Sequence, residues 1–190
     1  ASDVYKRQKL FFMAKFIYVD NSNLWIEGKH ISAVKKGKAS SIREALTKNI
    51  CDNSFRIDYG KLTNLIAGTQ NDVSRALLVG SVPPPQDSLW EQIKQRGYEV
   101  IKYSRNLNNH EKKVDTTILT NMLKDIYTKM TNKDIIYLVA GDSDFAPAIE
   151  IAKQQNIKVC VCFWSHASTE LKKAADQFIS LNGKIDKIKP

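Results

Sequence analysis

Four aspartates have positions in the sequence that would suit them to binding a divalent cation. Asp20 ends one apolar run, and Asp142 and Asp144 follow a second apolar run. Asp115 opens a stretch with a helical pattern. A carboxylate beside an apolar core is costly unless something pairs with it, and two strands that end in this way predict one shared acidic pocket. The ligand that such a pocket suits is a hard divalent cation bound by oxygen.

Polar neighbours accompany these acids. Asn21 and Asn23 share a turn with Asp20, and Ser143 lies between Asp142 and Asp144. These groups could orient water or carboxylates around a cation. For any one of the acids alone, capping of a helix is the better explanation, but the set of four favours a metal site.

The chain of 190 residues has a net charge of +9 and a pI of about 9.4. A basic protein with an acidic pocket suits a polyanionic substrate, although many basic proteins bind no nucleic acid. Lys113 lies beside Asp115, and Arg105 and Lys112 flank the same predicted loop; these residues could contact a substrate phosphate or could be solvated loop residues. The lysine-rich segment 28–40 is predicted to be a mobile basic excursion that could follow an RNA backbone.

Strand-like and helix-like segments alternate along the chain, which predicts right-handed crossovers and a parallel sheet. The predicted strands are 15–20, 75–81, 98–103, 134–140 and 157–163. The predicted helices are about 40–50, 58–67, 86–96, 115–130, 144–155 and 168–175, and 104–113 is predicted to be a loop. Ligands of such sheets sit beyond the carboxyl ends of the strands, so neighbouring first and fourth strands would bring the acids to one crevice.

The expected organisation is a single domain at 13–182, preceded by a non-native extension at 1–12 and followed by a basic tail at 183–190. No apolar run approaches the roughly 20 residues that span a bilayer, and no signal peptide is apparent, so a cytoplasmic protein is expected. Cys160 and Cys162 share one face of a predicted strand. They could ligate a metal, but no second pair completes a zinc site, and buried free thiols are favoured.

The sequence resembles the NYN domain group of the PIN-like nuclease superfamily, close to its LabA-like branch. The resemblance covers about residues 13–182, and its most specific piece is Gly-Asp-Ser-Asp-Phe at 141–145. Other matching pieces occur in order at 18–23, 112–115, 122–123, 157–159, 168–171 and 175–178. The resemblance implies a three-layer α/β/α sandwich around a five-stranded parallel sheet of order 3-2-1-4-5.

The resemblance also implies a metal-dependent ribonuclease whose site acids match Asp20, Asp115, Asp142 and Asp144. Mg²⁺ or Mn²⁺ suits such an all-oxygen site, with Asp20 and Asp142 as the nearest ligands. The cation would activate water for in-line attack on phosphorus, and the products would carry a 5′-phosphate and a 3′-hydroxyl. The family often has glycine at the position of Lys113 and serine at that of Ala140, and the insertion at about 28–56 is longer than expected.

Other interpretations of the sequence remain open. The same fold could serve as a non-catalytic RNA-binding or regulatory module, with single-stranded RNA as the favoured partner in either case. A phosphatase with an aspartyl nucleophile is a third interpretation, although the second acid expected two residues after Asp20 is missing. Trp25 could stack on a base, but packing in the core is favoured for it, as for Trp90 and Trp164. Apolar residues on the last helix could form a homodimer face.

Overall fold

The computed structural model describes residues 13–82, 87–104 and 110–190, and the predicted extension 1–12 lies outside this part of the chain. Within it, one parallel sheet has the strand order β3-β2-β1-β4-β5-β6. The α/β class and the order 3-2-1-4-5 are therefore confirmed, and β6 adds a sixth strand that was not predicted. The strands are β1 (Lys15–Asp20), β2 (Val73–Val82), β3 (Glu99–Ser104), β4 (Ile135–Val139), β5 (Lys158–Phe163) and β6 (Gln177–Ser180).

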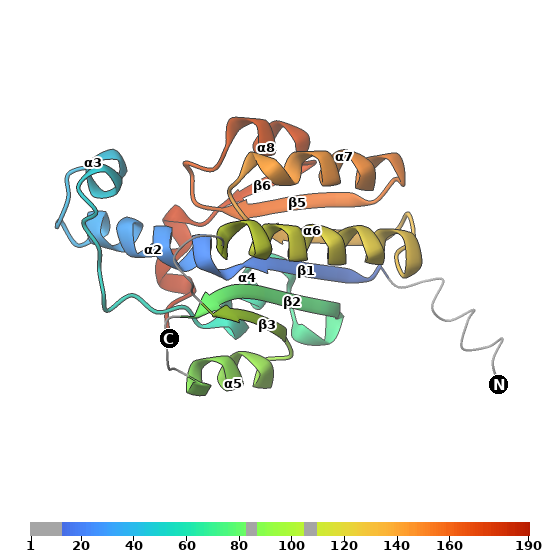
Figure 1. Cartoon of the computed structure of the whole chain (residues 1–190), viewed down its shortest axis with the longest axis horizontal. Helices are drawn as coiled ribbons and strands as arrows, with labels where there is room; N and C mark the ends of the chain where they lie inside the picture. The colour runs from blue at the N-terminus through green and yellow to red at the C-terminus, as the bar shows by residue number, and fades with distance from the viewer. Residues whose placement is uncertain (1–12, 83–86, 105–109) are drawn as a thin grey trace.

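Helices cover both faces of this sheet (Figure 1). One face carries α2 (Asn21–Lys35), α4 (Tyr59–Ala67) and α5 (Asp87–Gln95), and the short α3 (Ile42–Thr47) packs against α2. The other face carries α6 (His110–Thr128), α7 (Ala146–Gln154) and α8 (Thr169–Ala174). Short 3-10 turns occupy Gln70–Asp72, Ser143–Phe145 and Asn182–Lys187. The result is the predicted three-layer arrangement.

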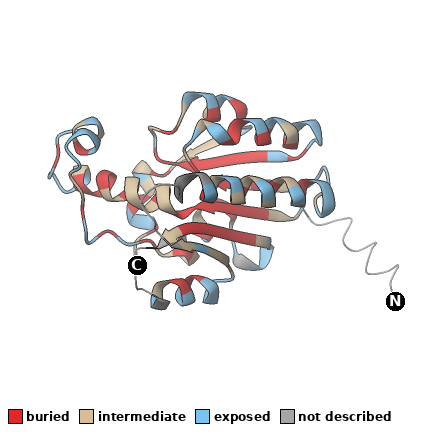
Figure 2. Cartoon of the chain, viewed as in Figure 1, coloured by how far each residue is buried: buried red, intermediate tan, exposed pale blue. Residues whose placement is uncertain are grey.

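The central strands are buried from both sides, and solvent-exposed residues lie mainly on the outer surfaces of the helices (Figure 2). Alternate side chains of β1 enter different clusters: Ile17 packs with the α2, α4 and α5 side, and Tyr18 with the α6, α7 and α8 side. Strands covered on both faces must be apolar in both directions, which explains why the sequence shows continuous apolar runs here.

The structure corrects the prediction for segment 28–40. Residues 28–35 are the second half of helix α2, because Ile31 and Ala33 are buried in the protein. The basic side chains that favoured a solvated excursion are paired: Lys35 with Asp186, and Lys36 with the buried Asp52 at 2.8 Å. Tertiary packing and ion pairs therefore fix a helix where local composition favoured a loop.

A second correction concerns the loop predicted at 104–113. Residue 104 ends β3, residues 110–113 are the first turn of α6, and residues 105–109 lie outside the described part. Other local signals are confirmed: Asp58 accepts a hydrogen bond from the Lys61 amide at 3.0 Å as N-cap of α4. Gly97 has φ +84 directly after α5, where a left-handed residue ends the helix.

The last residues of the chain contribute to the core. Ile185 and Ile188 are fully buried in the cluster formed by α2, α4 and α5, although 183–190 is predicted to be a basic tail. The basic residues of this segment stay at the surface. In the described ranges 13–82, 87–104 and 110–190, no helix is long and apolar enough to cross a bilayer.

Helix α2 lies so close to its neighbours that one position excludes any side chain. A Cβ atom on Gly28 would lie 2.5 Å from Phe55 Cε1 and 2.8 Å from Trp164 Cζ2. Trp164 also donates its indole N–H to the Leu24 carbonyl at 3.0 Å, so it fixes both the position and the rotation of the helix.

We therefore expect Gly28→Ala to lower the free energy of unfolding by about 1–2 kcal/mol, because overpacking outweighs the gain in helix propensity. Urea unfolding followed by circular dichroism measures the change. Gly183→Ala is the matched control, since nothing lies within 4 Å of a Cβ atom built there. A Gly28→Ala protein as stable as the wild type would show that α2 does not pack this closely.

Candidate metal centre

Three carboxylates from two separate parts of the chain meet at the carboxyl edge of the sheet. One oxygen each from Asp115, Asp142 and Asp144 lies within 4.8 Å of the other two. Asp115 comes from the second turn of α6, whereas Asp142 and Asp144 follow β4. The sequence predicted these three acids as one site, and the structure brings them together. All three are at least partly open to solvent, so a substrate can reach them.

The turn after β4 is fixed by short-range contacts. Asp142 caps the 3-10 turn Ser143–Phe145, and its Oδ1 accepts from the Asp144 amide at 3.1 Å and from Ser143 Oγ at 3.3 Å. Gly141 lies against Phe163, where an added Cβ atom would be 2.3 Å from the ring. Glycine is therefore required for the chain to pass this close to β5 and to turn both acids outward.

Asp20 lies beside this cluster but is not one of its three members. Its side chain is 1% exposed and accepts from the Asn23 amide at 3.1 Å and from Asn23 Nδ2 at 2.8 Å. Burial raises the pKa of Asp20 from its ordinary value near 3.8 to about 7, against the lowering effect of the Asn23 bond, and the nearby negative charge of Asp115 adds to the increase. Asp20 is therefore close enough to Asp115 to sense its charge.

The other predicted site residues are dispersed. Asn23 supports Asp20, whereas Asn21 turns away and accepts a hydrogen bond from the hydroxyl of Tyr59. Lys113 is exposed in the first turns of α6. The backbone of Lys112 belongs to α6, but its side chain is outside the described part, as is all of Arg105. Their contacts with substrate stay predictions.

The donor set suits a small hard cation. Among the described residues it consists of carboxylate oxygens only, without the thiol or imidazole groups that favour zinc or copper. Two ligand atoms on opposite sides of an octahedral Mg²⁺ are about 4.2 Å apart. The three carboxylate oxygens lie within 4.8 Å of one another, so their separations are close to those of such a shell. Small side-chain rotations or intervening waters would complete such a shell.

The sequence did not point to the polar groups that end β2 at the same edge. Ser22 Oγ lies 3.1 Å from Ser81 Oγ and accepts from the Ser81 amide at 3.0 Å, which ties the start of α2 to β2. The signal that could have found Ser81 is the one that singled out Asp20: a polar residue at the carboxyl end of a buried parallel strand. A cavity discussed below opens at this position, lined by Asn21 and Ser81.

The described histidines have partners of their own. His30 Nδ1 lies 2.9 Å from the Ile50 carbonyl, and His166 Nε2 bonds to Glu27 of α2. The side chain of His110 is outside the described part. Cys160 and Cys162 are buried free thiols with their sulfur atoms 3.8 Å apart, which agrees with the sequence interpretation.

A parallel α/β sheet with an acidic cluster at its carboxyl edge is the arrangement of PIN-like nucleases. The family model of the NYN domain matches residues 17–182, which is most of the chain. The chain therefore belongs to the NYN domain family, within the PIN-like nuclease superfamily. No curated protein matches it. The LabA-like branch stays a prediction.

The raised pKa of Asp20 makes the stability of the metal-free protein depend on pH. The unfolded chain ionises Asp20 near pH 4 and the native protein near pH 7, so the native state binds more protons between these values. The contribution of Asp20 to stability therefore falls as the pH rises from 4 to 7 and then levels off.

We expect Asp20→Asn to remove this decline and, with EDTA present at pH 8, to raise the free energy of unfolding by up to about 4 kcal/mol. Asparagine at position 20 can still accept the hydrogen bond that caps the helix, and the side-chain amide of Asn23 can turn so that its oxygen accepts from the new N–H group. Urea unfolding of both proteins from pH 4 to pH 8 measures the difference between their free energies of unfolding at each pH. The contributions of the other titrating groups are the same in both proteins and cancel in this difference. Parallel stability profiles would show that native Asp20 ionises at its ordinary pKa.

Proposed function

We propose that this protein is a metal-dependent endoribonuclease that hydrolyses phosphodiester bonds of single-stranded RNA. Membership of the NYN family and the acidic cluster support a nuclease. The net charge of +9 supports a polyanionic substrate. The observation that carries the proposal is the convergence of the Asp115, Asp142 and Asp144 carboxylates within 4.8 Å at the carboxyl edge of the sheet.

The acids have distinct proposed roles. Asp115, Asp142 and Asp144 would hold Mg²⁺ or Mn²⁺, which supplies activation of water and stabilisation of charge on the phosphate. Positive charge bound beside Asp115 would favour ionisation of Asp20, so that its proton leaves and a fourth carboxylate faces the site. Asn23 holds that carboxylate in place through its amide, and Ser143 and the Asp144 amide do the same for Asp142.

Some finer proposals concern the surroundings of this site. Lys113, with Lys112 and Arg105, would contact the substrate phosphates on the α6 side. We place the chain in the LabA-like branch on its Gly-Asp-Ser-Asp-Phe piece at 141–145. The cytoplasm is the proposed place of action, where free thiols such as Cys160 and Cys162 stay reduced.

The decisive experiment replaces Asp142. We expect Asp142→Asn to lower Mn²⁺-dependent cleavage of a labelled single-stranded RNA by at least about 100-fold, because it removes one charge of the proposed cation site. Calorimetry should show weaker Mn²⁺ binding, while circular dichroism and the unfolding midpoint stay close to those of the wild type. Asp72→Asn is the matched control, because Asp72 is an exposed acid just before β2, at the opposite edge of the sheet.

Three results would contradict the proposal. Wild-type protein that binds RNA but neither takes up Mn²⁺ nor cuts RNA would be a binding module on a nuclease fold. Wild-type protein that hydrolyses small phosphomonoesters and leaves RNA intact would favour a phosphatase. Equal cleavage by the wild type and Asp142→Asn would place the chemistry elsewhere.

A further inference from the structure

A second feature of the carboxyl edge is a cavity of about 270 Å³, here called the α2–α5 cavity, that differs in character from the acidic cluster. Its walls come from α2, the start of α4 and the segment before it, the end of β2, α5 and Pro190. We propose that this cavity binds one unstacked base of a single-stranded RNA whose phosphate lies at the acidic cluster, with Trp25 as the stacking surface. The proposal rests on the proposed function, since it assigns a subsite to the same substrate.

The position of the cavity follows from the start of α2. Asp20 and Asn21 are consecutive, but Asp20 bonds to Asn23 beside the acidic cluster, whereas Asn21 bonds to Tyr59 in the wall of the cavity. Trp25 follows Asn21 by four residues, so both lie on one face of the helix. The cavity therefore begins at the residue that follows Asp20, which itself lies beside the acidic cluster, and we propose that the adjacent nucleotide spans the two.

The chemistry of the lining suits a neutral heterocycle. Its polar side chains are uncharged groups that can donate or accept hydrogen bonds at the edge of a base: Asn21, Ser81, Ser88 and Gln92. Among the residues that the structure describes, Arg56 is the charged side chain of the lining and no acidic side chain takes part in it. The volume lies below the roughly 300–1,000 Å³ typical of sites for drug-sized ligands, as a single base requires.

Trp25 is the tryptophan that a ligand can reach. Trp90 and Trp164 are 3% and 0% exposed, whereas Trp25 is only partly buried against the core. The Lys29 ammonium lies 4.7 Å from the centroid of the Trp25 ring. Because Lys29 covers one face of this ring, a base would stack on the other face, and the positive charge of Lys29 would remain close to its phosphate. Sequence reasoning favoured a core role for Trp25, and its exposure allows it to bind as well.

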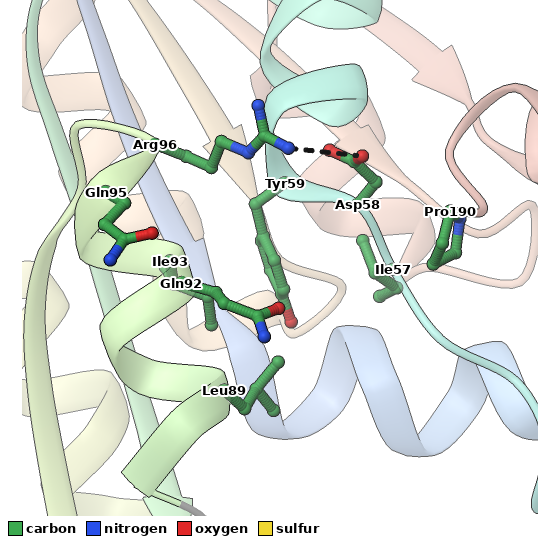
Figure 3. Close-up of a pocket in the computed structure, with 9 residues that line it drawn as sticks. All are labelled: Ile57, Asp58, Tyr59, Leu89, Gln92, Ile93, Gln95, Arg96 and Pro190. Atoms are coloured by element: carbon green, nitrogen blue, oxygen red, sulfur yellow. Dashed lines mark ion pairs between the residues drawn. The ribbon is translucent and has the colours of Figure 1, made fainter.

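A larger cavity of about 470 Å³ continues from the first between α4 and α5, and the two share Tyr59, Leu89 and Gln92 in their walls. Figure 3 shows Tyr59 alongside the α5 side chains, with the Asp58–Arg96 ion pair, 4.0 Å long, beyond it. Because this larger cavity contains an acid and lacks Trp25, we place the base in the smaller one.

Nuclear magnetic resonance of the Asp142→Asn protein in EDTA tests binding without cleavage. Uridine and adenosine 5′-monophosphates are added to ¹⁵N-labelled protein while the indole N–H signals are followed. We expect the Trp25 signal to shift in a saturable way. The Trp164 signal should stay in place, because its N–H is buried and bonded to the Leu24 carbonyl.

Variants test the same subsite with RNA. In EDTA and on the Asp142→Asn background, Trp25→Ala should weaken binding of an eight-nucleotide single-stranded RNA by about 5- to 150-fold, the range for loss of one stacked base. Trp25→Phe should retain most of the affinity because it keeps an aromatic face. Tyr127→Ala is the matched control, since Tyr127 is 64% exposed near the far end of α6 from Asp115.

The outcomes separate this inference from the proposed function. An unmoved Trp25 signal together with equal RNA affinity of Trp25→Ala would overturn the base-binding proposal, even where wild type with Mn²⁺ cuts RNA. An equal loss of affinity in Trp25→Ala and Tyr127→Ala would also overturn it, since the effect would not be specific to the cavity. A shifted Trp25 signal with selective loss in Trp25→Ala supports it, even where no cleavage occurs and the nuclease proposal fails.

Discussion

The parallel pairing of β1 with β4 is the constraint on which the candidate site depends. Val19 lies opposite Val139 in this pairing, so the two strands end side by side, β1 at Asp20 and β4 just before Ala140. Both strands are buried on both faces, and a shift by one residue would send every side chain of β1 into the wrong layer. The packing of the core thus sets the position of Asp20 and of the turn that carries Asp142 and Asp144.

Helix α2 meets two opposing requirements at its first turn. Asp20 lies beside an acidic cluster, while Asn21 lines the α2–α5 cavity, and the helix can satisfy both only at one rotation about its axis. Trp164 provides that restraint through its bond to Leu24 and its close approach to Gly28. A tryptophan far along the sequence therefore keeps the two sides of the carboxyl edge distinct.

The sequence predicted what local pattern and strand order determine. The apolar runs predicted β1 to β5. The acids at the ends of these runs, together with Asp115 at the start of a helical pattern, predicted an acidic site, and Asp115, Asp142 and Asp144 do lie in one cluster. The failures occurred where distant residues decide the outcome. Helix α2 continues to Lys35 in a lysine-rich segment because Ile31 and Ala33 are buried and Asp186 pairs with Lys35. The short β6 has little pattern of its own and depends on β5 as its partner.

A basic protein with an acidic site faces an electrostatic conflict when its ligand is RNA. Without a cation, the three clustered carboxylates repel the phosphate that must approach them. Part of the basic charge cannot help, because Lys35, Lys36 and Lys38 are paired with buried or surface acids. Attraction must then come from unpaired surface cations, from the bound metal and from contacts that do not involve charge. The base subsite proposed for the α2–α5 cavity would supply the last of these, because stacking on Trp25 would retain RNA at a site whose own charge opposes it.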